Sequence, residues 1–160
     1  IVPAPNSTDL QLVAQDYITR LLNHLNYVGV LTLELFVTEQ GLYANEMACR
    51  VHNSGHWSIE GAVCSQFENH IRAVAGLPLG STDVIRPTVM VNIIGQHPKS
   101  EDVLALNGAH LHLYNKTERE GRKLGHITLM PVNSEDLVGL CRQLAQILPE
   151  PLALKADMTL

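Results

Sequence analysis

The segment Asn45–Trp57 carries a high density of side chains that can take part in chemistry. It contains a carboxylate, an arginine, two histidines, two side-chain amides, a hydroxyl and the only tryptophan of the chain. A buried strand would not carry so many polar groups, because each would need a hydrogen-bond partner away from water. The pattern indicates a strand end that leads into a polar loop, where a charged small molecule binds. The alternative is a hydrogen-bonded turn that only braces the core.

Two glutamates have a spacing that suits a shared cation. The runs 28–37 and 42–48 have the composition of two strands of a hairpin. A turn centred on Gln40 would place Glu34 directly opposite Glu46, and like charges so placed repel each other. Mg²⁺ shared with phosphate oxygens and water would remove this repulsion. A shifted register, or an arginine partner for one glutamate, is the alternative.

The same register predicts which side chains lie on each face of this hairpin. The small alanines on the glutamate face would leave room beside the carboxylates. The glutamate face would also carry Thr32, Phe36, Ala44 and Ala48. The opposite face would belong to the core, and it holds Leu33, Leu35, Val37, Tyr43 and Met47.

Basic residues are concentrated in the short segment 116–123. It contains Lys116, Arg119, Arg122 and Lys123, although the whole chain has 11 Lys and Arg against 16 Asp and Glu. Such a concentration in an acidic chain predicts an anion site, and a substrate phosphate would fit it. From the sequence alone, a solvated hairpin turn explains the cluster equally well.

The composition argues against several classes of protein. A formal net charge of −5 argues against nucleic-acid binding, which needs a basic surface. No apolar run reaches membrane-spanning length and no signal peptide opens the sequence, so no membrane partner is expected. The three cysteines have no metal-binding spacing and indicate reduced thiols in a cytoplasmic protein. Cys64 and Cys141 lie in apolar patterns and are expected in the core.

The rest of the chain supplies further helices and strands. Ser7 to Asp9 offer a helix N-cap, and apolar residues recur at helical spacing from there to Leu25. Helical spacing returns over 66–75, and Gly80–Asp83 has the composition of a break. Three strands are then predicted, at 88–94, 110–114 and 123–130. A last helix, capped by Ser134, would use Leu137, Leu140, Cys141, Leu144 and Ile147.

The segment Asn45–Trp57 also resembles the signature of the ATP-grasp carboxylases of purine synthesis, and of the 5-(carboxyamino)imidazole ribonucleotide synthases in particular. Their pattern is Asn-Glu-x-Ala-Pro-Arg-x-His-Asn-Ser-Gly-His-Trp, and this sequence departs from it at Cys49, where the family usually has proline. The match continues through Ser65–Glu68 and Gly76–Gly80 and returns at Gly121–His126. The resemblance therefore covers nearly the whole chain, while the chain covers less than half of the family's length.

For the glutamates and the loop, the resemblance implies the parts of an ATP-dependent carboxylase site. Glu34 and Glu46 match the acidic residues with which ATP-grasp enzymes hold Mg²⁺ or Mn²⁺, and Asn45 would join Glu46 in binding the nucleotide and its metal. In that family the loop lies between the ATP phosphates and the imidazole substrate. The resemblance implies that Arg50, His52 and Asn53 take part in catalysis. It implies that Ser54 binds the substrate.

For the basic segment, the family pattern is a Lys followed by Arg-Pro-Gly-Arg-Lys-x-Gly-His. Its first Lys and second Arg hold the ribose 5-phosphate of the substrate. This implies the same role for Lys116 and Arg122, with Lys123 beside them. Glu120 replaces the proline and brings an acid next to the cluster, and His126 is expected to be structural.

The implied fold is α+β. It comprises the carboxy-terminal part of an ATP-grasp domain over residues 1–80, a small β-rich domain with a closing helix over 84–152, and a tail over 153–160. The sequence opens without Met, which suggests a carboxy-terminal fragment of the family protein. Such a fragment is expected to be inactive alone, because the family's adenine pocket and phosphate-binding lysines lie upstream.

The implied activity is that of an ATP-dependent carbon–nitrogen ligase. ATP phosphorylates bicarbonate, and carboxyphosphate, or CO₂ released from it, carboxylates the amine of 5-aminoimidazole ribonucleotide. The expected partners are these three substrates and a second copy in a homodimer. One alternative is the formate-using ATP-grasp transformylase of purine synthesis, whose loop has Asp-Thr-Gly where this chain has Asn53, Ser54 and Gly55. Another is a non-catalytic binding or dimerisation module.

Overall fold

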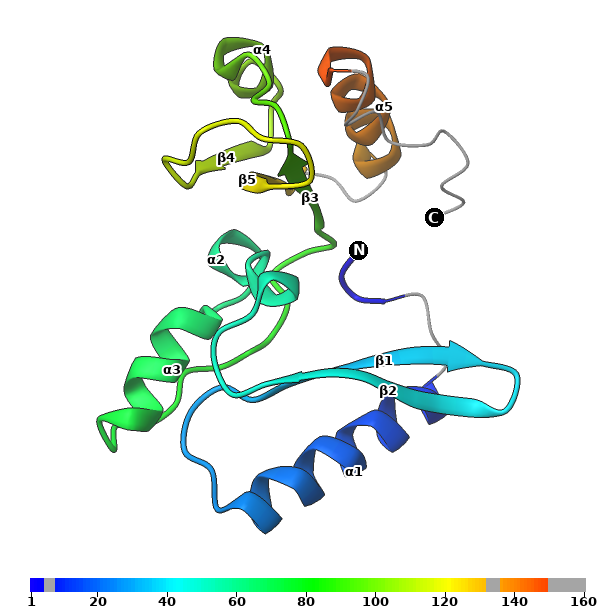
Figure 1. Ribbon diagram of the computed structural model, residues 1–160, viewed down its shortest axis with the longest axis vertical. Coiled ribbons are helices and arrows are strands. Elements are labelled where there is room, and N and C mark those ends of the chain that lie inside the picture. The colour runs from blue at the N-terminus through cyan, green and yellow to red at the C-terminus, as the bar shows by residue number, and fades with distance from the viewer. Residues whose placement is uncertain (5–7, 132–135, 150–160) are drawn as a thin grey trace. The chain divides into compact units, whose positions relative to one another are not determined.

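The computed structural model describes residues 1–4, 8–131 and 136–149, and its contacts divide the chain into two units. The first unit runs from Ala4 to Asp83. The second combines Ile1–Pro3 with the chain from Val84 onward, and Val2 pairs with Thr88 in an isolated bridge (Figure 1). Among the described residues, no helix has the length and apolarity needed to cross a membrane.

The first unit is a long helix beside a two-stranded antiparallel hairpin, followed by short helices (Figure 1). Its elements are α1 (Thr8–Leu25), β1 (Thr32–Thr38), β2 (Gly41–Ala48), the 3₁₀ helix η1 (Asn53–Gly55), α2 (Ser58–Gly61) and α3 (Gln66–Val74). Both predicted helices are confirmed, while Ser7 of the expected cap lies outside the described residues. β1 begins later than the predicted strand, because Gly29 has φ of 126°, outside the extended region.

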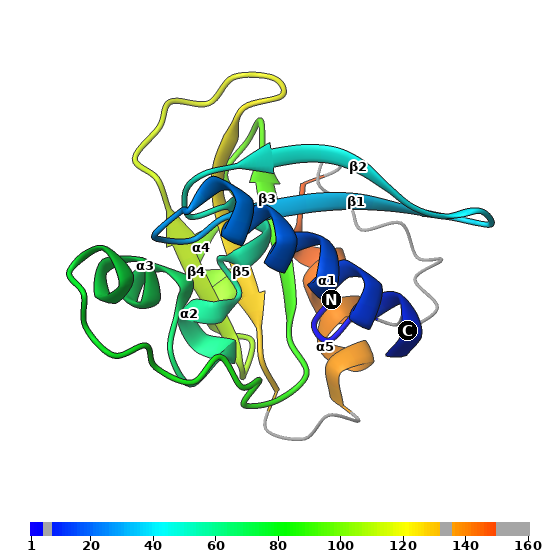
Figure 2. The ribbon, with the colours of Figure 1, turned by 90° about the horizontal axis from the view of Figure 1, so that it is seen from below.

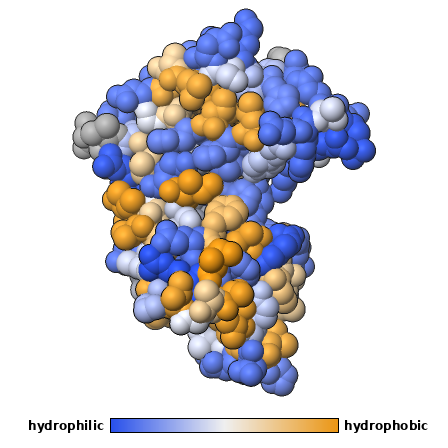
Figure 3. Space-filling view, turned by 90° about the vertical axis from the view of Figure 1, so that its left-hand side faces the viewer, coloured by the Kyte–Doolittle hydropathy of each residue, from blue (hydrophilic) through white to orange (hydrophobic). Residues whose placement is uncertain are grey.

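The apolar face predicted for α1 exists, but it is only partly covered. None of the residues of α1 is buried, and Leu25 is 46% exposed. Hydrophobic side chains, in orange, are visible on the surface in Figure 3. The helical periodicity therefore predicted the helix correctly, while full burial of its apolar face would need a second surface.

The second unit is built on a three-stranded antiparallel sheet. Its elements are β3 (Val89–Ile94), α4 (Ser100–Leu104), β4 (Ala109–Leu113), β5 (Lys123–Leu129) and α5 (Leu137–Ile147). The strand order is β3-β5-β4, so the last strand lies in the middle. The three predicted strands and the closing helix are confirmed, whereas α4 was not predicted. Ser134, the expected cap of the last helix, lies outside the described residues.

The core of the second unit forms between the sheet and α5. The buried hydrophobic side chains are Val89, Val91, Ile93, Val103, Leu124, Ile127, Leu129, Leu137, Leu140, Cys141, Leu144 and Leu148. Ile147 packs against this cluster while partly buried, so the predicted apolar face of α5 is confirmed. Cys64 and Cys141 are buried free thiols, as expected, and burial raises the pKa of the Cys141 thiol. The architecture as a whole is α+β.

Candidate functional site

A β-bulge gathers three polar side chains on the β1–β2 hairpin. The ladder pairs Glu34 with Glu46, as the sequence predicted, and Asn45 is the extra residue of a bulge next to this pair. A bulge redirects the side chain of its extra residue. Asn45 Nδ2 donates a hydrogen bond to Glu34 Oε2 at 3.3 Å. Two carboxylates and one amide therefore share one side of the hairpin.

The hairpin turn differs from the turn predicted around Gln40. Thr38 pairs with Gly41, so the outer part of the ladder is displaced by one residue until the bulge restores the register. The prediction was therefore wrong for Ala44, which pairs with Leu35 on the face away from the carboxylates. Three side chains expected in the core are about half exposed instead, namely Val37, Tyr43 and Met47.

The imidazole of His52 lies between the two carboxylates. Its Nδ1 is 3.6 Å from Glu34 Oε1, and its Nε2 is 3.8 Å from Glu46 Oε1. Both distances exceed those of hydrogen bonds but allow electrostatic attraction when the ring is protonated. His52 is 8% exposed, whereas the side chains of Glu34 and Glu46 are 34% and 53% exposed. The two carboxylates are therefore accessible to a ligand, whereas the His52 ring is buried.

Ser54 determines which nitrogen of the His52 ring carries hydrogen. The Ser54 backbone N–H donates to His52 Nδ1 at 3.3 Å, and Ser54 Oγ lies 2.9 Å from the same nitrogen. A backbone N–H can only donate, so Nδ1 acts as the acceptor. The neutral ring therefore carries its hydrogen on Nε2, the nitrogen nearer Glu46.

Gln66, the first residue of α3, fixes the backbone of this loop, a role that no sequence pattern indicated. Its Oε1 accepts from His52 N at 2.9 Å, and its Nε2 donates to His52 O at 2.7 Å and lies 2.9 Å from His56 Nδ1. The spacing of Ser65 and Glu68 could have located the start of α3, because Ser65 Oγ accepts from the Glu68 N–H as an N-cap. It could not have indicated that the Gln66 side chain turns toward the loop.

Arg50 and Asn53 lie on either side of His52 in the sequence. Arg50 is exposed, and its Nη1 donates to the Val51 carbonyl at 3.0 Å. Asn53 is half-buried at the start of η1. At Cys49, where the resemblance predicted proline, the backbone carbonyl accepts a hydrogen bond from Tyr27 Oη at 2.8 Å. The polar loop is thus braced at its start, and the exposed guanidinium of Arg50 is available to an anion.

The donor set of the hairpin fits Mg²⁺ although it is small. The described residues hold no group of three or more His, Cys, Asp or Glu side chains arranged for a metal ion. Mg²⁺ commonly takes one or two carboxylates and completes its octahedron with phosphate oxygens and water. Glu34, Glu46 and the amide oxygen of Asn45 are donors of this kind, and Glu34 and Glu46 are directly paired across the ladder.

The basic residues of the predicted phosphate site belong to the second unit. Lys116 and Arg122 lie in the connection between β4 and β5, drawn in yellow beyond the strands in Figure 2, and Lys123 begins β5. Lys116 Nζ lies 5.3 Å from the centroid of the Tyr114 ring, a cation–π contact. Arg122 Nη1 donates to Thr117 O at 3.3 Å and to Thr117 Oγ1 at 3.0 Å. Neighbouring groups therefore hold Lys116 and Arg122 in defined positions.

His126 has the environment of a structural residue, as expected from the sequence. It is 2% exposed, and its Nδ1 lies 2.7 Å from Tyr114 Oη. Its ring stacks on that of His112, with centroids 4.4 Å apart and planes 9° apart. Because Tyr114 also contacts Lys116, the buried His126 holds the tyrosine whose ring the lysine contacts.

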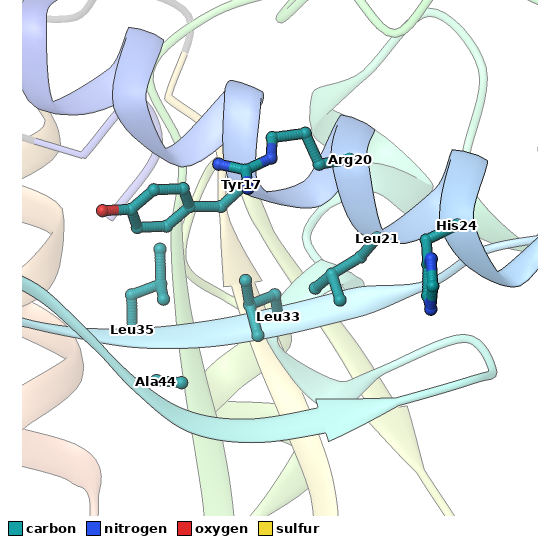
Figure 4. A pocket seen from close by; sticks show the side chains of 7 residues that line it. All are labelled: Tyr17, Arg20, Leu21, His24, Leu33, Leu35 and Ala44. Atoms are coloured by element: carbon teal, nitrogen blue, oxygen red, sulfur yellow. The ribbon is translucent and has the colours of Figure 1, made fainter.

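A cavity of about 510 Å³ opens between α1 and the hairpin (Figure 4). Its lining consists of Tyr17, Arg20, Leu21, His24, Leu33, Leu35 and Ala44. Leu33 and Leu35 project from the face of β1 opposite to that of Glu34, because side chains alternate along a strand. The cavity therefore lies on the other face of the hairpin from the carboxylates, and no predicted site residue lines it.

Two family models match the chain, one in each unit. The model of the ATP-grasp domain matches residues 1–67, and the model of the phosphoribosylaminoimidazole carboxylase C-terminal domain matches residues 88–138. The chain is 56% identical over 126 residues to the N5-carboxyaminoimidazole ribonucleotide synthase of Pseudomonas aeruginosa. That match covers 79% of this chain and 35% of the relative.

Solved structures lead to the same group of proteins. The crystal structure of N5-carboxyaminoimidazole ribonucleotide synthetase from Thermus thermophilus aligns with a TM-score of 0.88 at 52% identity, over 93% of this chain and 42% of that one. The synthase from Aspergillus clavatus, solved with ADP and 5-aminoimidazole ribonucleotide, aligns with a TM-score of 0.81 at 32% identity, over 90% and 41%. The chain thus spans less than half the length of these proteins.

Proposed function

Because the chain belongs to the N5-carboxyaminoimidazole ribonucleotide synthases, a group of ATP-grasp proteins, we propose that its residues serve in the active site of such a ligase. In the proposed reaction ATP transfers its γ-phosphoryl group to bicarbonate, which gives carboxyphosphate and ADP. Carboxyphosphate, or CO₂ released from it, then carboxylates the exocyclic amine of 5-aminoimidazole ribonucleotide, and phosphate leaves. The homodimer expected from the sequence stays a prediction.

The proposed task of the hairpin is to hold Mg²⁺, or Mn²⁺, against the phosphates of ATP. Glu34 and Glu46 would be its carboxylate ligands, with Asn45 beside them for the nucleotide and metal. When bound, the ion supplies charge neutralisation to the phosphate oxygens. The hydrogen bond from Asn45 to Glu34 keeps that carboxylate aimed at the shared side of the hairpin. His52 Nε2 lies 3.8 Å from Glu46 Oε1, so the ring borders the same side of the hairpin as the two acids.

The proposed task of the loop is to bind bicarbonate and the intermediate formed from it. Arg50 is exposed and carries a planar fork of donors that matches a carboxylate or phosphate. His52, Asn53 and Ser54 would complete the pocket for carboxyphosphate and the aminoimidazole. Since phosphoryl and carboxyl transfer need positioning and charge stabilisation above all, a loop held by hydrogen bonds suits this work.

The proposed task of the basic segment is to hold the ribose 5-phosphate of the substrate. Lys116 and Arg122 would contact the phosphate, with Lys123 adding charge. The contacts of Lys116 with Tyr114 and of Arg122 with Thr117 support this, because cations held in place lose less freedom when an anion binds. Glu120 is exposed at the end of the same connection and would not have to face the phosphate.

The observation that carries the proposal is the arrangement around the hairpin. Glu34 and Glu46 pair directly, Asn45 bonds to one of them, and His52 lies within 4 Å of both. These four residues occur in a chain that is 56% identical, over 126 residues, to an N5-carboxyaminoimidazole ribonucleotide synthase. No feature of the described residues favours the transformylase or a non-catalytic module over this interpretation.

The proposal is tested with a chimera in which this chain replaces the matching segment of the Pseudomonas aeruginosa relative. We expect the chimera to release ADP only when bicarbonate and 5-aminoimidazole ribonucleotide are both present, and to form the carboxylated product. We expect the isolated 160-residue chain to release none. ADP release that depends on formate instead of bicarbonate would favour the transformylase. A folded chimera without bicarbonate-dependent turnover would contradict the proposed function.

A further inference from the structure

We propose that Gln66 is a positioning residue for His52: its carboxamide holds the loop backbone so that the His52 ring stays between Glu34 and Glu46. The inference rests on the proposed function, because it gives Gln66 a task in the same site. Gln66 acts through the loop and does not have to contact a substrate itself. Its own contacts, the space around it and the distances of the His52 ring all bear on this role.

The carboxamide of Gln66 uses its acceptor and its amino group on one short loop. Oε1 accepts from the backbone N–H of His52 at 2.9 Å, while Nε2 donates to the carbonyl of the same residue at 2.7 Å. Nε2 also lies 2.9 Å from His56 Nδ1, which can accept its second hydrogen. A reversed amide would bring the NH₂ group against the His52 N–H, donor against donor. The orientation of the side chain is therefore determined by its partners.

The backbone of Gln66 adds another connection between α3 and the loop. Its N–H donates to Ser58 Oγ at 3.0 Å, and this hydroxyl in turn donates to the Gly55 carbonyl at 2.6 Å. Ser58 is 6% exposed, so little water competes with these bonds. The first residue of α3 thus binds the loop at His52, His56 and, through Ser58, at Gly55.

The absence of a side chain at Gly55 is a condition of this arrangement. A Cβ atom added there would lie 2.5 Å from Gln66 Oε1 and 2.8 Å from Gln66 Cδ. Real Cβ atoms essentially never come so close to other heavy atoms, so an alanine would displace the carboxamide from the loop. Gly55→Ala therefore breaks the same hydrogen bonds as a change of Gln66, without altering Gln66 itself.

The position of the His52 backbone determines where its ring lies. The ring nitrogens are 3.6 Å and 3.8 Å from the two carboxylates, and Ser54, two residues on, bonds to Nδ1. A backbone released from Gln66 would shift the ring and its contact with Ser54 together. Displacements of about 1 Å within an active site can cost roughly 100-fold in rate.

The first test is spectroscopic and uses the 160-residue chain. We expect the ¹⁵N shifts of the His52 ring to report a single tautomer with hydrogen on Nε2 in the unaltered chain. Gln66→Leu should replace this signature with a mixture of tautomers. Gln66→Glu should also give a mixture of tautomers. The glutamate side chain has the size of glutamine and keeps an acceptor for the His52 N–H, but it lacks the two N–H donors of the NH₂ group. Gln143→Leu, a change of an exposed glutamine in α5, is the matched control and should leave the signature intact.

The second test measures kinetics in the chimera. Gln66→Leu should lower kcat about 100-fold while the KM for ATP changes by less than about twofold. Gln143→Leu should leave both constants unchanged. An inactive unaltered chimera would count against the proposed function. An active chimera in which Gln66→Leu and Gln66→Glu keep normal kcat, with the His52 tautomer unchanged, would overturn the present inference alone.

A double-mutant cycle separates positioning from general destabilisation. Gly55→Ala alone should lower kcat about tenfold or more, and it should add little in a Gln66→Ala background, where the space is vacated. Independent, additive losses would contradict the proposed mechanism. Should Gln66→Leu fail to fold, Gly55→Ala decides the question, since an unchanged His52 signature in that variant would also overturn the proposal.

Discussion

The two units differ in what holds their functional residues in place. In the second unit, β5 lies in the middle of a sheet whose inner side chains form a hydrophobic cluster with α5, and the basic segment leaves this core as an exposed connection. In the first unit, α1 has no buried residue and the hairpin that carries Glu34 and Glu46 is largely exposed. There, hydrogen bonds from Asn45, Ser54 and Gln66 do the positioning.

Removing a polar group and removing an apolar group should therefore have opposite consequences in the two units. A polar change near the hairpin should damage chemistry while the fold survives, because little of the unit's stability comes from that side chain. An apolar change in the second unit should damage the fold first, because it opens a cavity in a closely packed cluster.

Glu46→Gln in the chimera should have the greatest consequence. It removes one of two carboxylates proposed to hold Mg²⁺, and we expect kcat to fall about 1,000-fold, the upper range for loss of one charge-stabilising group. The free energy of unfolding should rise slightly, if at all, because the repulsion with Glu34 disappears. Steady-state rates at several Mg²⁺ concentrations and urea denaturation measure the two quantities.

Glu39→Gln provides the matched control for this prediction. Glu39 lies in the exposed turn of the same hairpin, so the change removes an identical charge at a position away from the paired acids. Its kcat should stay within about twofold of the unaltered chimera. Unchanged activity and unchanged Mg²⁺ dependence in Glu46→Gln would rule out the metal assignment.

The second prediction compares two leucines, one in each unit. Leu129 of β5 is fully buried, whereas Leu25 of α1 is 46% exposed. Leu129→Ala should lower the free energy of unfolding by about 3 kcal/mol, and Leu25→Ala by about 0.5 kcal/mol. Urea denaturation of the 160-residue chain, with hydrogen exchange to identify the unit that opens, measures both. If the two variants lost the same free energy of unfolding, the packing around Leu25 and Leu129 would differ less than the exposed fractions of these two side chains indicate.

The elements of the second unit could be predicted because their signals are local. The spacing of Leu137, Leu140 and Leu144 repeats with the period of a helix, and all three are buried in α5. The strands are bounded by turn residues, and each predicted end lies within one residue of the observed end. α4 was missed because its five residues, Ser100–Leu104, are too few to show a helical period.

The candidate site could be predicted only in part, since its geometry depends on tertiary contacts. The density of polar residues predicted the loop, and strand pairing predicted the opposition of Glu34 and Glu46. The bulge at Asn45 left no local signal in the sequence. It arises because the two-residue turn sets one register, in which Leu35 pairs with Ala44, whereas Glu34 pairs with Glu46 in a register displaced by one residue. The contact of Gln66 with His52 joins residues 14 positions apart, and no periodicity describes such an approach.

A smaller kinetic effect is expected from changes in the proposed phosphate-binding segment of the second unit. A charge-assisted hydrogen bond contributes about 1.5–3 kcal/mol, or roughly 10- to 150-fold in affinity. Arg122→Ala in the chimera should therefore raise the KM for 5-aminoimidazole ribonucleotide by about that factor, while the KM for ATP stays nearly unchanged. Arg122→Lys should recover part of the loss, because a point charge replaces a planar fork of donors incompletely.

Arg119→Ala distinguishes a phosphate grip from a mere loss of positive charge in the same connection. Arg119 is exposed and carries the same charge, but the proposal gives it no contact with the phosphate. The KM of the Arg119→Ala variant for 5-aminoimidazole ribonucleotide should therefore change by less than about threefold.

Arg122 also bonds to Thr117 through Nη1, so Arg122→Ala releases part of the connection as well. Thr117→Val removes the hydroxyl but keeps Arg122, and it should cost less than Arg122→Ala. If Thr117→Val costs as much, Arg122 acts by ordering the connection and the phosphate assignment falls. Equal increases in the KM for ATP and for the ribonucleotide would likewise exclude a specific role at the ribose phosphate.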